Sequence, residues 1–451
     1  MPGLSKANIK KTYYYLKKNG ISATLYEVKG RLKKKDEYVK RTPSAKMLSR
    51  DEVADNKYPL ISVLVPTYNT PADMLRMLLD SIEKQTYPKW ELVIADGSTD
   101  DLVESLVKSE CGEKNFAGTI NYRRLSENKG ITGNTNQALA FATGDYCCLL
   151  DHDDFLETDA LEIIAKTIVD RTEETGERPV YLYSDEDKCD AEGKNFFDPN
   201  YKPDFNLDYL ISNNYICHLT TVRTDVLKGL GFRKEFEGAQ DHDLVLRAVY
   251  EAGATPVHIP VVLYHWRCFA GSSSENPANK LYAYEAGKNA AAAAVKAFGW
   301  DAEISDSNHV GFYLINYKTD IFETRKEVGA VGGIVVRGKS SGQILAGPSW
   351  DGNQLFRGLP GKYGGPVNRR CISQEADGLD IRNIRIRTEL YDVFKDVVGT
   401  TYSENENGFF DYNLLGNDCE YDEISKKLSD AIRASGYKLI YMPEMETVWK
   451  K

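Results

Sequence analysis

The order of apolar and polar residues predicts alternating strands and helices from residue 59 onward. Residues 60–66 are almost wholly apolar, which is typical of a strand that a parallel sheet buries on both faces. The next segment, opened by Pro71, repeats apolar residues between 74 and 82 at the spacing of one helical face. The alternation continues with strands at 91–96, 120–125 and 145–150 and a helix at 132–142. We therefore predict an α/β fold built on a doubly wound parallel sheet.

The second half of the chain alternates less regularly and contains a repeat. The predicted elements are strands at 180–183, 215–222, 256–264 and 437–442, and helices at 241–251, 278–298 and 420–435; a glycine-rich region extends from about 328 to 366. Three residues, Gly253, Pro260 and Trp266, recur with the same spacing as Gly436, Pro443 and Trp449. We interpret the repeat as a degenerate second copy of one helix–strand unit, with chance agreement as the alternative. Val448 replaces His265 in the second copy.

Positive charge is concentrated at the N-terminus. The chain has 451 residues and a net charge of −10, yet residues 1–50 carry +11, which leaves −21 on the rest. An acidic body argues against nucleic acid as a partner. The basic arm, helical over about 6–34, is expected either to contact an anionic membrane surface or to be an ordinary solvated face.

The sequence indicates neither a membrane span nor an oxidising compartment. No stretch approaches the roughly 18 apolar residues of a spanning helix, and the first residues lack the pattern of a cleaved signal peptide. The eight cysteines form no CxxC motif, and Cys147 and Cys148 are adjacent in a predicted buried strand. We therefore expect reduced thiols, no zinc site and a cytoplasmic protein, including one bound at the inner membrane face.

Polar residues follow directly after three of the predicted strands. These are Pro66–Asn69, Asp96 and Asp151–Asp154. In open α/β sheets ligands bind beyond the carboxyl ends of the strands, and the glycine-rich motifs of dinucleotide and P-loop sites are absent. The pattern favours a site in which Tyr68 stacks on a base, Asp96 accepts base N–H groups, and Asp151 and Asp153 hold Mg²⁺ or Mn²⁺ against a diphosphate. The alternative for the aspartates is a solvated turn or a helix cap.

Several stretches between residues 59 and 320 resemble family 2 glycosyltransferases of the GT-A fold, the kind that builds bacterial surface polysaccharides. They are Val63–Asn69, Leu92–Asp100, Asn128–Asn136, Leu149–Asp154, Tyr183–Lys188, Gln240–Leu244 and Leu263–Arg267, in the family's order. The resemblance implies a catalytic GT-A domain, Rossmann-like and specific for nucleotide-diphospho-sugars, at 58–322. A basic helical arm and linker (1–57) would precede it, and a smaller, degenerate α/β module (323–451) would follow.

The resemblance also implies roles for individual residues. The nucleotide base and ribose would be held by Pro66, Thr67, Tyr68, Asn69 and Asp96, with Lys129 and Gly130 nearby. Asp151 would face the ribose or the metal, Asp153 would bind the metal, and His265 would complete the metal–diphosphate site. Asp241 matches the catalytic base, Asp185 would line the donor-sugar pocket, and Trp266 and Arg267 would contact an acceptor sugar.

Two departures from the family pattern leave alternatives open. Ala95 stands where the family often has a first Asp, and Gln240 stands where Glu often precedes the base. Asp243 therefore remains a second candidate for the base, and Asp241 could instead cap its helix. His265 could be satisfied by backbone groups, Trp266 could pack in the core, and residues 183–187 could form a plain acidic turn.

These observations together predict a metal-dependent, inverting glycosyltransferase. It would move a sugar from a UDP- or dTDP-sugar to a growing, lipid-linked glycan of the cell surface, with Mn²⁺ or Mg²⁺ as cofactor. The alternative from another class is a non-catalytic nucleotide- or glycan-binding protein on the same fold. The enzyme hypothesis requires that Asp96, Asp153 and Asp241 converge on one cavity.

Overall fold

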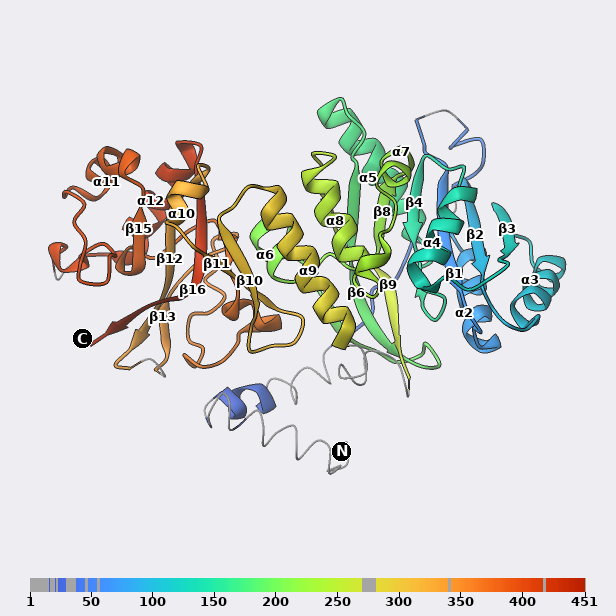
Figure 1. The fold of residues 1–451 in the computed structure, drawn as a ribbon, viewed down its shortest axis with the longest axis horizontal. Coiled ribbons are helices and arrows are strands. Elements are labelled where there is room, and N and C mark those ends of the chain that lie inside the picture. The colour runs from blue at the N-terminus through green and yellow to red at the C-terminus, as the bar shows by residue number, and fades with distance from the viewer. Residues whose placement is uncertain are drawn as a thin grey trace. The chain divides into compact units, whose positions relative to one another are not determined.

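The computed structural model describes residues 38–44, 48–54, 57–269, 281–339, 342–416 and 419–450, with residues 16, 21 and 23–29 of the N-terminal segment. The described residues 23–29 are helical, and most of the helix expected over 6–34 lies outside the described residues. The chain forms two compact units, one of residues 37–205 and 214–298, the other of residues 1–36, 206–213 and 299–451 (Figure 1). The expected boundary at 322 therefore falls within the second unit, because the hairpin 302–317 belongs to that unit.

The first unit is built on a nine-stranded mixed sheet. Its order is β3-β2-β1-β4-β8-β6-β9-β5, and β7 pairs with β6. The strands are β1 (Ile61–Thr67), β2 (Trp90–Asp96), β3 (Thr119–Arg124), β4 (Tyr146–Leu149), β5 (Phe155–Leu156), β6 (Tyr181–Asp190), β7 (Phe196–Asn200), β8 (Thr220–Arg223) and β9 (Val257–Cys268). The helices are α2 (Ala72–Glu83), α3 (Leu102–Glu113), α4 (Gly130–Phe141), α5 (Ala160–Thr175), α7 (Thr224–Leu230), α8 (Gln240–Tyr250) and α9 (Leu281–Ala297), with a 3-10 turn η1 (Lys234–Phe236).

The apolar pattern correctly placed the first four strands, which pair in parallel. Every residue of β2 is buried, and the apolar face of α2 packs into the same core. The remainder of the sheet is mixed rather than parallel, because β8 runs antiparallel to both β4 and β6. The strand expected at 215–222 is the short β8, and the residues before it contribute to the site described below.

The second unit contains a five-stranded sheet and a hairpin. Its sheet order is β13-β12-β16-β14, with β15 paired to β12, and β10 pairs with β11. The strands are β10 (Ala302–Asp306), β11 (Tyr313–Tyr317), β12 (Val328–Arg337), β13 (Ile344–Ala346), β14 (Gln374–Ala376), β15 (Ile384–Ile386) and β16 (Lys438–Trp449). The helices are α6 (Leu207–Ser212), α10 (Ile321–Thr324), α11 (Tyr391–Val398) and α12 (Tyr421–Ala434), with 3-10 turns η3 (Pro366–Cys371), η4 (Ile381–Asn383), η5 (Thr388–Leu390) and η6 (Tyr412–Leu414).

The α6 helix joins this unit although it lies within the sequence of the first. Its Asp208 forms a buried ion pair with Arg325, and Asn206 donates to the carbonyl oxygen of Glu375 at 2.7 Å. Sequence pattern alone gave no sign of this insertion, because a short helix carries no marker of the core in which it packs.

The two copies of the repeat adopt matching elements. In each, a helix (α8 or α12) is followed by a glycine with positive φ, Gly253 or Gly436, and then by a twelve-residue strand. The strands β9 and β16 both pair in parallel with a ten-residue partner, and both pairings break register beside the repeated proline. This match supports common ancestry of the two units, and the degenerate copy stays a prediction.

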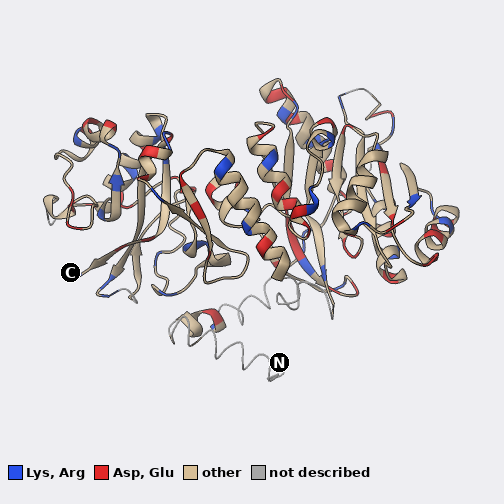
Figure 2. Ribbon diagram, viewed as in Figure 1, with Lys and Arg blue, Asp and Glu red and all other residues tan. Residues whose placement is uncertain are grey.

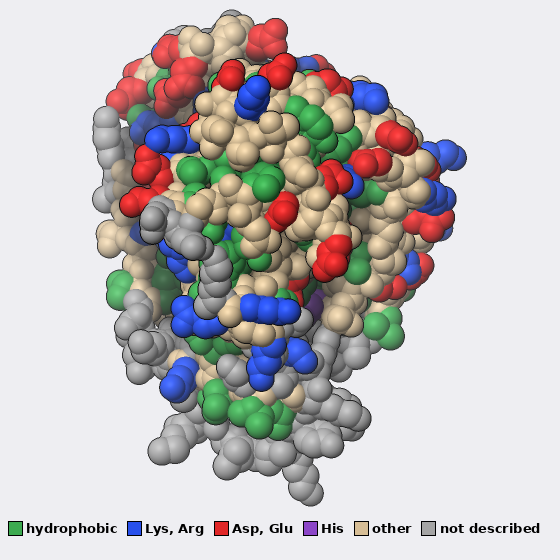
Figure 3. Space-filling model, turned by 90° about the vertical axis from the view of Figure 1, so that its left-hand side faces the viewer, with side chains coloured by type: hydrophobic (Ala, Val, Ile, Leu, Met, Phe, Trp, Pro, Cys, Tyr) green, Lys and Arg blue, Asp and Glu red, His purple; other side chains and the backbone are tan. Residues whose placement is uncertain are grey.

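Charged side chains are spread over the elements of both units (Figure 2). On the face drawn in Figure 3, acidic side chains gather toward the top and basic ones around the lower middle. Among the described residues, no helix has both the length and the apolar character needed to cross a bilayer.

Candidate active site

A cavity of about 630 Å³ lies in the first unit, at the carboxyl ends of β1 and β4. Seven of the residues singled out from the sequence line it, namely Pro66, Thr67, Tyr68, Gly130, Asp151, Asp241 and Trp266. Further walls come from the residues before β8, the loop before α8, and the first turn of α9. A volume of this size falls within the usual range of small-molecule sites.

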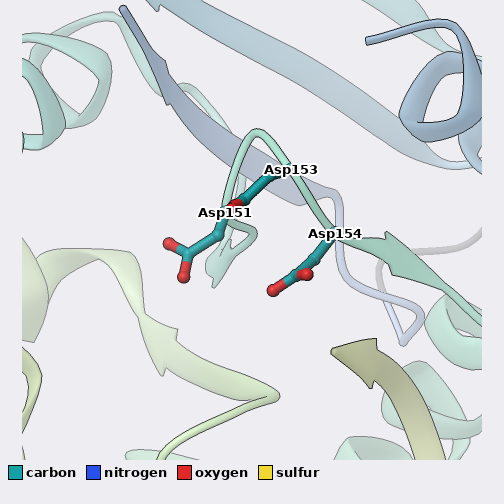
Figure 4. A group of neighbouring side chains, drawn as sticks. All are labelled: Asp151, Asp153 and Asp154. Carbon is teal, nitrogen blue, oxygen red and sulfur yellow. The ribbon is translucent and has the colours of Figure 1, made fainter. Parts of the chain in front are cut away.

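An aspartate turn directly after β4 forms one wall. Asp151, Asp153 and Asp154 each bring a carboxylate oxygen within 4.8 Å of the others, all from one turn of the chain (Figure 4). Asp154 is buried, and it accepts hydrogen bonds from the Tyr264 hydroxyl at 2.5 Å and the Arg267 amide at 2.8 Å. These bonds fix the turn, and the sequence reasoning had not assigned them to Asp154.

The aspartate turn fits a hard divalent cation. Burial and the neighbouring carboxylates raise the pKa of Asp153, and they raise that of Asp154 well above its usual value. A bound cation would relieve this repulsion, and an all-oxygen ligand set suits Mg²⁺ or Mn²⁺. Asp151 and Asp153 are the residues placed to hold it.

His218 forms a second wall that sequence reasoning missed. Its Nδ1 lies 3.0 Å from Glu186 Oε2, its Nε2 lies 3.7 Å from Asp151 Oδ2, and its ring stacks on Tyr264 with centroids 4.5 Å apart. Burial opposes a charge on His218, but Cys217 and the two carboxylates raise its pKa well above the ordinary value. The imidazole therefore joins the aspartate turn to Glu186.

The two candidates for the base have different surroundings. Asp241 lines the cavity, and Asn214 Nδ2 donates to its Oδ2 at 2.9 Å. Asp243 is buried between Arg233 and Arg247, and it does not line the cavity. The helix α8 begins at Gln240 with Ala239 as its N-cap residue, so Asp241 is not the cap. The geometry favours Asp241 as the base.

Asp96 lies outside the cavity. Its side chain is fully buried and accepts hydrogen bonds from Thr67, Ser98, Tyr122 and Arg124. Because its oxygens already have these donors, the geometry gives it an architectural role, tying β1 to β2 and β3, in place of the expected base contact. Of the three acids expected to converge on one cavity, Asp241 alone lines it; Asp96 and Asp153 do not, although Asp153 lies within 4.8 Å of Asp151, which does.

Two other residues expected at the donor pocket lie beside it. Asn69 Oδ1 accepts from the Thr99 amide at 3.0 Å, and the exposed Lys129 pairs with Glu127 at 3.1 Å. Neither lines the cavity. Tyr68, directly before Asn69 in the sequence, lines the cavity and is 44% exposed, as a base-stacking residue requires.

The expected roles of Asp185, His265 and Arg267 do not fit their positions. Asp185 accepts from the Lys202 amide and from His258, both at 2.9 Å, away from the cavity. Side chains alternate along a strand, so Asp185 and Glu186 point to opposite faces of β6, and only Glu186 faces His218.

His265 and Arg267 are turned away from the cavity by the same alternation along β9. His265 is completely buried, with Nδ1 2.6 Å from Asp187 Oδ1 and Nε2 3.5 Å from Glu157 Oε2, so it does not join the aspartate turn. Arg267 is buried over the Phe155 ring. Trp266, between them, is the residue of this stretch that lines the cavity.

Glu237 is a further cavity residue that the sequence did not mark. Its carboxylate accepts hydrogen bonds from the backbone amides of Ile131 (2.9 Å) and Thr132 (3.3 Å), in the first turn of α4. A carboxylate is favourable there because a helix N-terminus carries partial positive charge. The contact joins the loop before α8 to the first turn of α4, over a sequence distance that local patterns do not span.

Asp151 of the aspartate turn and Asp241 of α8 thus line one cavity of this α/β unit. Residues 62–231 match the profile described as glycosyl transferase family 2. The match covers 170 of the 451 residues, so this segment of the chain is similar to that family.

Two relatives of this chain are named for the biosynthesis of O-antigen and of teichuronic acid. An O-antigen biosynthesis protein of Myxococcus xanthus is 32% identical over 268 residues, which are 59% of this chain and 20% of that protein. A putative teichuronic acid biosynthesis glycosyltransferase of Bacillus subtilis is 34% identical over 117 residues, 26% of this chain and 45% of the relative. An uncharacterized protein of Sinorhizobium fredii is 37% identical over 235 residues, 51% of this chain and 25% of the relative. The chain thus spans less than half the length of these relatives.

Proposed function

We propose that this chain transfers a sugar from a UDP- or dTDP-sugar to a glycan acceptor, with inversion and with Mn²⁺ or Mg²⁺ as cofactor. The observation that supports the proposal is one cavity lined both by Asp241 and by Asp151 of the aspartate turn. The names of the relatives support a cell-surface glycan as product.

The residues present can divide the chemistry between them. Asn214 holds Asp241 Oδ2, which leaves Oδ1 to take the proton of the acceptor hydroxyl. The acceptor oxygen then bonds to the anomeric carbon from the face opposite the diphosphate, and the carbon–oxygen bond to the diphosphate breaks with its electron pair. Asp151 and Asp153 would hold a divalent cation, which when bound would supply positive charge for the departing diphosphate.

The donor side of the cavity would be organised by Tyr68 and the α4 N-terminus. Tyr68 offers an exposed ring for the base, and Pro66, Thr67 and Gly130 line the adjoining wall. The acceptor is proposed to be lipid-linked and to be reached at the inner face of the membrane, where the basic residues 1–50 would contact anionic lipid.

Metal-dependent nucleotide binding tests the proposal. UDP and dTDP are titrated calorimetrically into the full chain with Mn²⁺ and with EDTA, using the wild type, Asp153→Ala, and Asp170→Ala as an exposed control on α5. We expect binding in Mn²⁺ that falls roughly tenfold or more in Asp153→Ala and is unchanged in the control. Equal affinity with and without metal would contradict the metal-dependent mechanism, and absence of nucleotide binding would remove the enzyme proposal.

A further inference from the structure

Large exposed apolar side chains gather around the candidate active site. Tyr282, on the first turn of α9, is 57% exposed, and Ile131, on the first turn of α4, is 39% exposed; both line the cavity. An exposed ring in a cavity is an unusual cost to a folded protein unless a ligand covers it. Tyr68 already provides such a ring on the donor side, so Tyr282 is a second ring without an assigned partner in the proposed reaction.

The Tyr282 ring lies against the loop that leads into the candidate base. A Cβ atom at Gly238 would come within 2.7 Å of Tyr282 Cε2, so the ring packs on the backbone of this glycine. Gly238 has φ of +88° and is followed three residues later by Asp241. Both Gly238 and Asp241 line the cavity beside Tyr282.

Trp266, the aromatic residue expected at the acceptor, is already engaged by the protein. The His218 ring meets it edge-on with centroids 5.7 Å apart, and Lys188 Nζ lies 5.5 Å from its ring centre. Tyr282 therefore offers the more open aromatic face on this side of the cavity.

The position of the base decides which substrate this face can meet. A general base must come within hydrogen-bond reach of the hydroxyl it deprotonates, so the reacting acceptor unit lies against Asp241. Tyr282 reaches this place from α9, whereas the residues proposed for the donor come from the ends of β1 and β4 and from the first turn of α4. A pyranose ring has an apolar C–H face that stacks on an aromatic side chain, and a lipid phosphate does not.

We propose that Tyr282 is the stacking platform for the acceptor sugar, and that the acceptor is consequently a pyranoside chain rather than a lipid phosphate or a protein hydroxyl. The inference rests on the proposed function, because it needs Asp241 to act on an acceptor hydroxyl.

Saturation-transfer NMR with cellotriose and chitotriose on the full chain, in the presence of UDP and Mn²⁺, tests this assignment. The variants are Tyr282→Ala, Tyr282→Phe, and Tyr201→Ala, which removes a 66% exposed tyrosine that lies outside the cavity. We expect transfer to the sugar C–H protons in the wild type, a roughly tenfold weaker apparent affinity in Tyr282→Ala, and wild-type behaviour in the other two. The phenylalanine variant separates stacking from a role of the hydroxyl.

The same samples distinguish failure of this inference from failure of the proposed function. UDP affinity measured in parallel should stay within twofold of wild type in all three variants, because Tyr282 does not belong to the donor side. Absence of sugar signals from the wild type, or equal signals from Tyr282→Ala, would overturn the platform while leaving metal-dependent UDP binding intact. A loss of UDP binding in Tyr282→Ala would overturn it as well, since the ring would then serve the donor.

Discussion

Asp241 and Asp243 lie two positions apart on one helix, and their surroundings give these two aspartates different roles. Asp243 is 2% exposed and neutralises Arg233 and Arg247, so removal of its charge leaves two guanidinium groups without their carboxylate. Asp241 accepts a hydrogen bond from the side-chain amide of Asn214 and lines the cavity. Both residues fall on one helix predicted from the sequence, which could not separate them because the arginine partners of Asp243 come from tertiary contacts.

The substitution Asp241→Asn should abolish transfer and preserve the fold. We expect turnover to fall by roughly 10²–10⁴-fold, because the amide cannot accept the acceptor proton, with UDP affinity and melting temperature near wild type. The matched change Asp243→Asn should instead lower the melting temperature. UDP release assays and thermal melts on both variants check this, and a fully active Asp241→Asn enzyme would transfer the role of base elsewhere.

At the residue scale, the sequence predicted those cavity residues that belong to local motifs. Asp151 and Tyr68 follow directly after predicted strands, and their position at the sheet edge could be inferred from the parallel pairing. His218 and Glu237 could not be found in this way, because their roles arise from partners 32 and 106 residues distant. His265 was misplaced since the motif identifies the strand, while the alternation along β9 decides which side chain faces the cavity.

At the scale of elements, the segment 38–44 packs as a strap on the first unit. Tyr38 donates to Asp187 at 2.7 Å, Lys40 lies 2.7 Å from Glu157, and Arg41 pairs with Asp159. His265 sits between the same Asp187 and Glu157. Two buried carboxylates and one histidine leave a negative charge uncompensated, and Lys40 of the strap balances it.

The strap therefore supports the pairing of β5 with β9, which adjoins the aspartate turn. We expect Lys40→Met to lower the stability of the first unit by about 1–3 kcal/mol, since it leaves a buried carboxylate without its cation. Lys40→Arg should restore most of the loss, and Lys108→Met, at a 72% exposed helical pair, should cost little. Melting temperatures of the wild type and the three variants test this prediction. Equal melting temperatures of Lys40→Met and Lys108→Met would show that the strap does not stabilise the first unit.

The loss of stability at acid pH should depend on two buried carboxylates, Glu157 and Glu186. Burial alone would raise the pKa of Glu157, but His265 and Lys40 lower it to about 2; likewise Lys202 and His218 lower that of buried Glu186 to about 2. Both values lie below the ordinary 4.5, so the unfolded chain binds the protons first as pH falls. Their stabilising contribution is complete above about pH 4.5 and is lost progressively toward about pH 2.

We expect melting temperatures to drop steeply between about pH 4.5 and 2, and Glu157→Gln to flatten that drop while lowering stability at neutral pH. Glu104→Gln, on an exposed helical pair, is the matched control. Acid slopes that are identical in wild type and Glu157→Gln would show that the carboxylate gains nothing on folding.

The sequence predicted those helices and strands whose apolar residues recur at one regular spacing. The strands β1, β2 and β4 and the helix α2 were predicted because their apolar residues keep one spacing and face one core. The two-residue β5 was not predicted, and β8 was expected over the longer range 215–222 without its antiparallel direction, since short strands are defined by their partners rather than by a pattern of their own.

At the scale of the whole molecule, part of the positive charge at the N-terminus belongs to the strap. Residues 1–50 carry +11, but Lys40 and Arg41 are committed to carboxylates of the first unit. A deletion of the entire basic arm would therefore disturb the fold near the active site and confuse membrane binding with stability. The pairs are made by Lys40 and Arg41, so replacing the lysines at 33, 34 and 35 keeps both of their cations.

Replacing Lys33, Lys34 and Lys35 with glutamine should weaken binding to anionic vesicles and leave UDP affinity unchanged. Each cation near an anionic surface contributes on the order of 1 kcal/mol at low salt, so the triple change should lower partitioning roughly tenfold to a hundredfold. Co-sedimentation with vesicles of phosphatidylglycerol and phosphatidylcholine measures it, with pure phosphatidylcholine and raised salt as controls. If the three substitutions leave partitioning unchanged, these lysines do not contact the membrane and belong to a solvated segment. Membrane binding through them would then play no part in bringing the acceptor to the cavity.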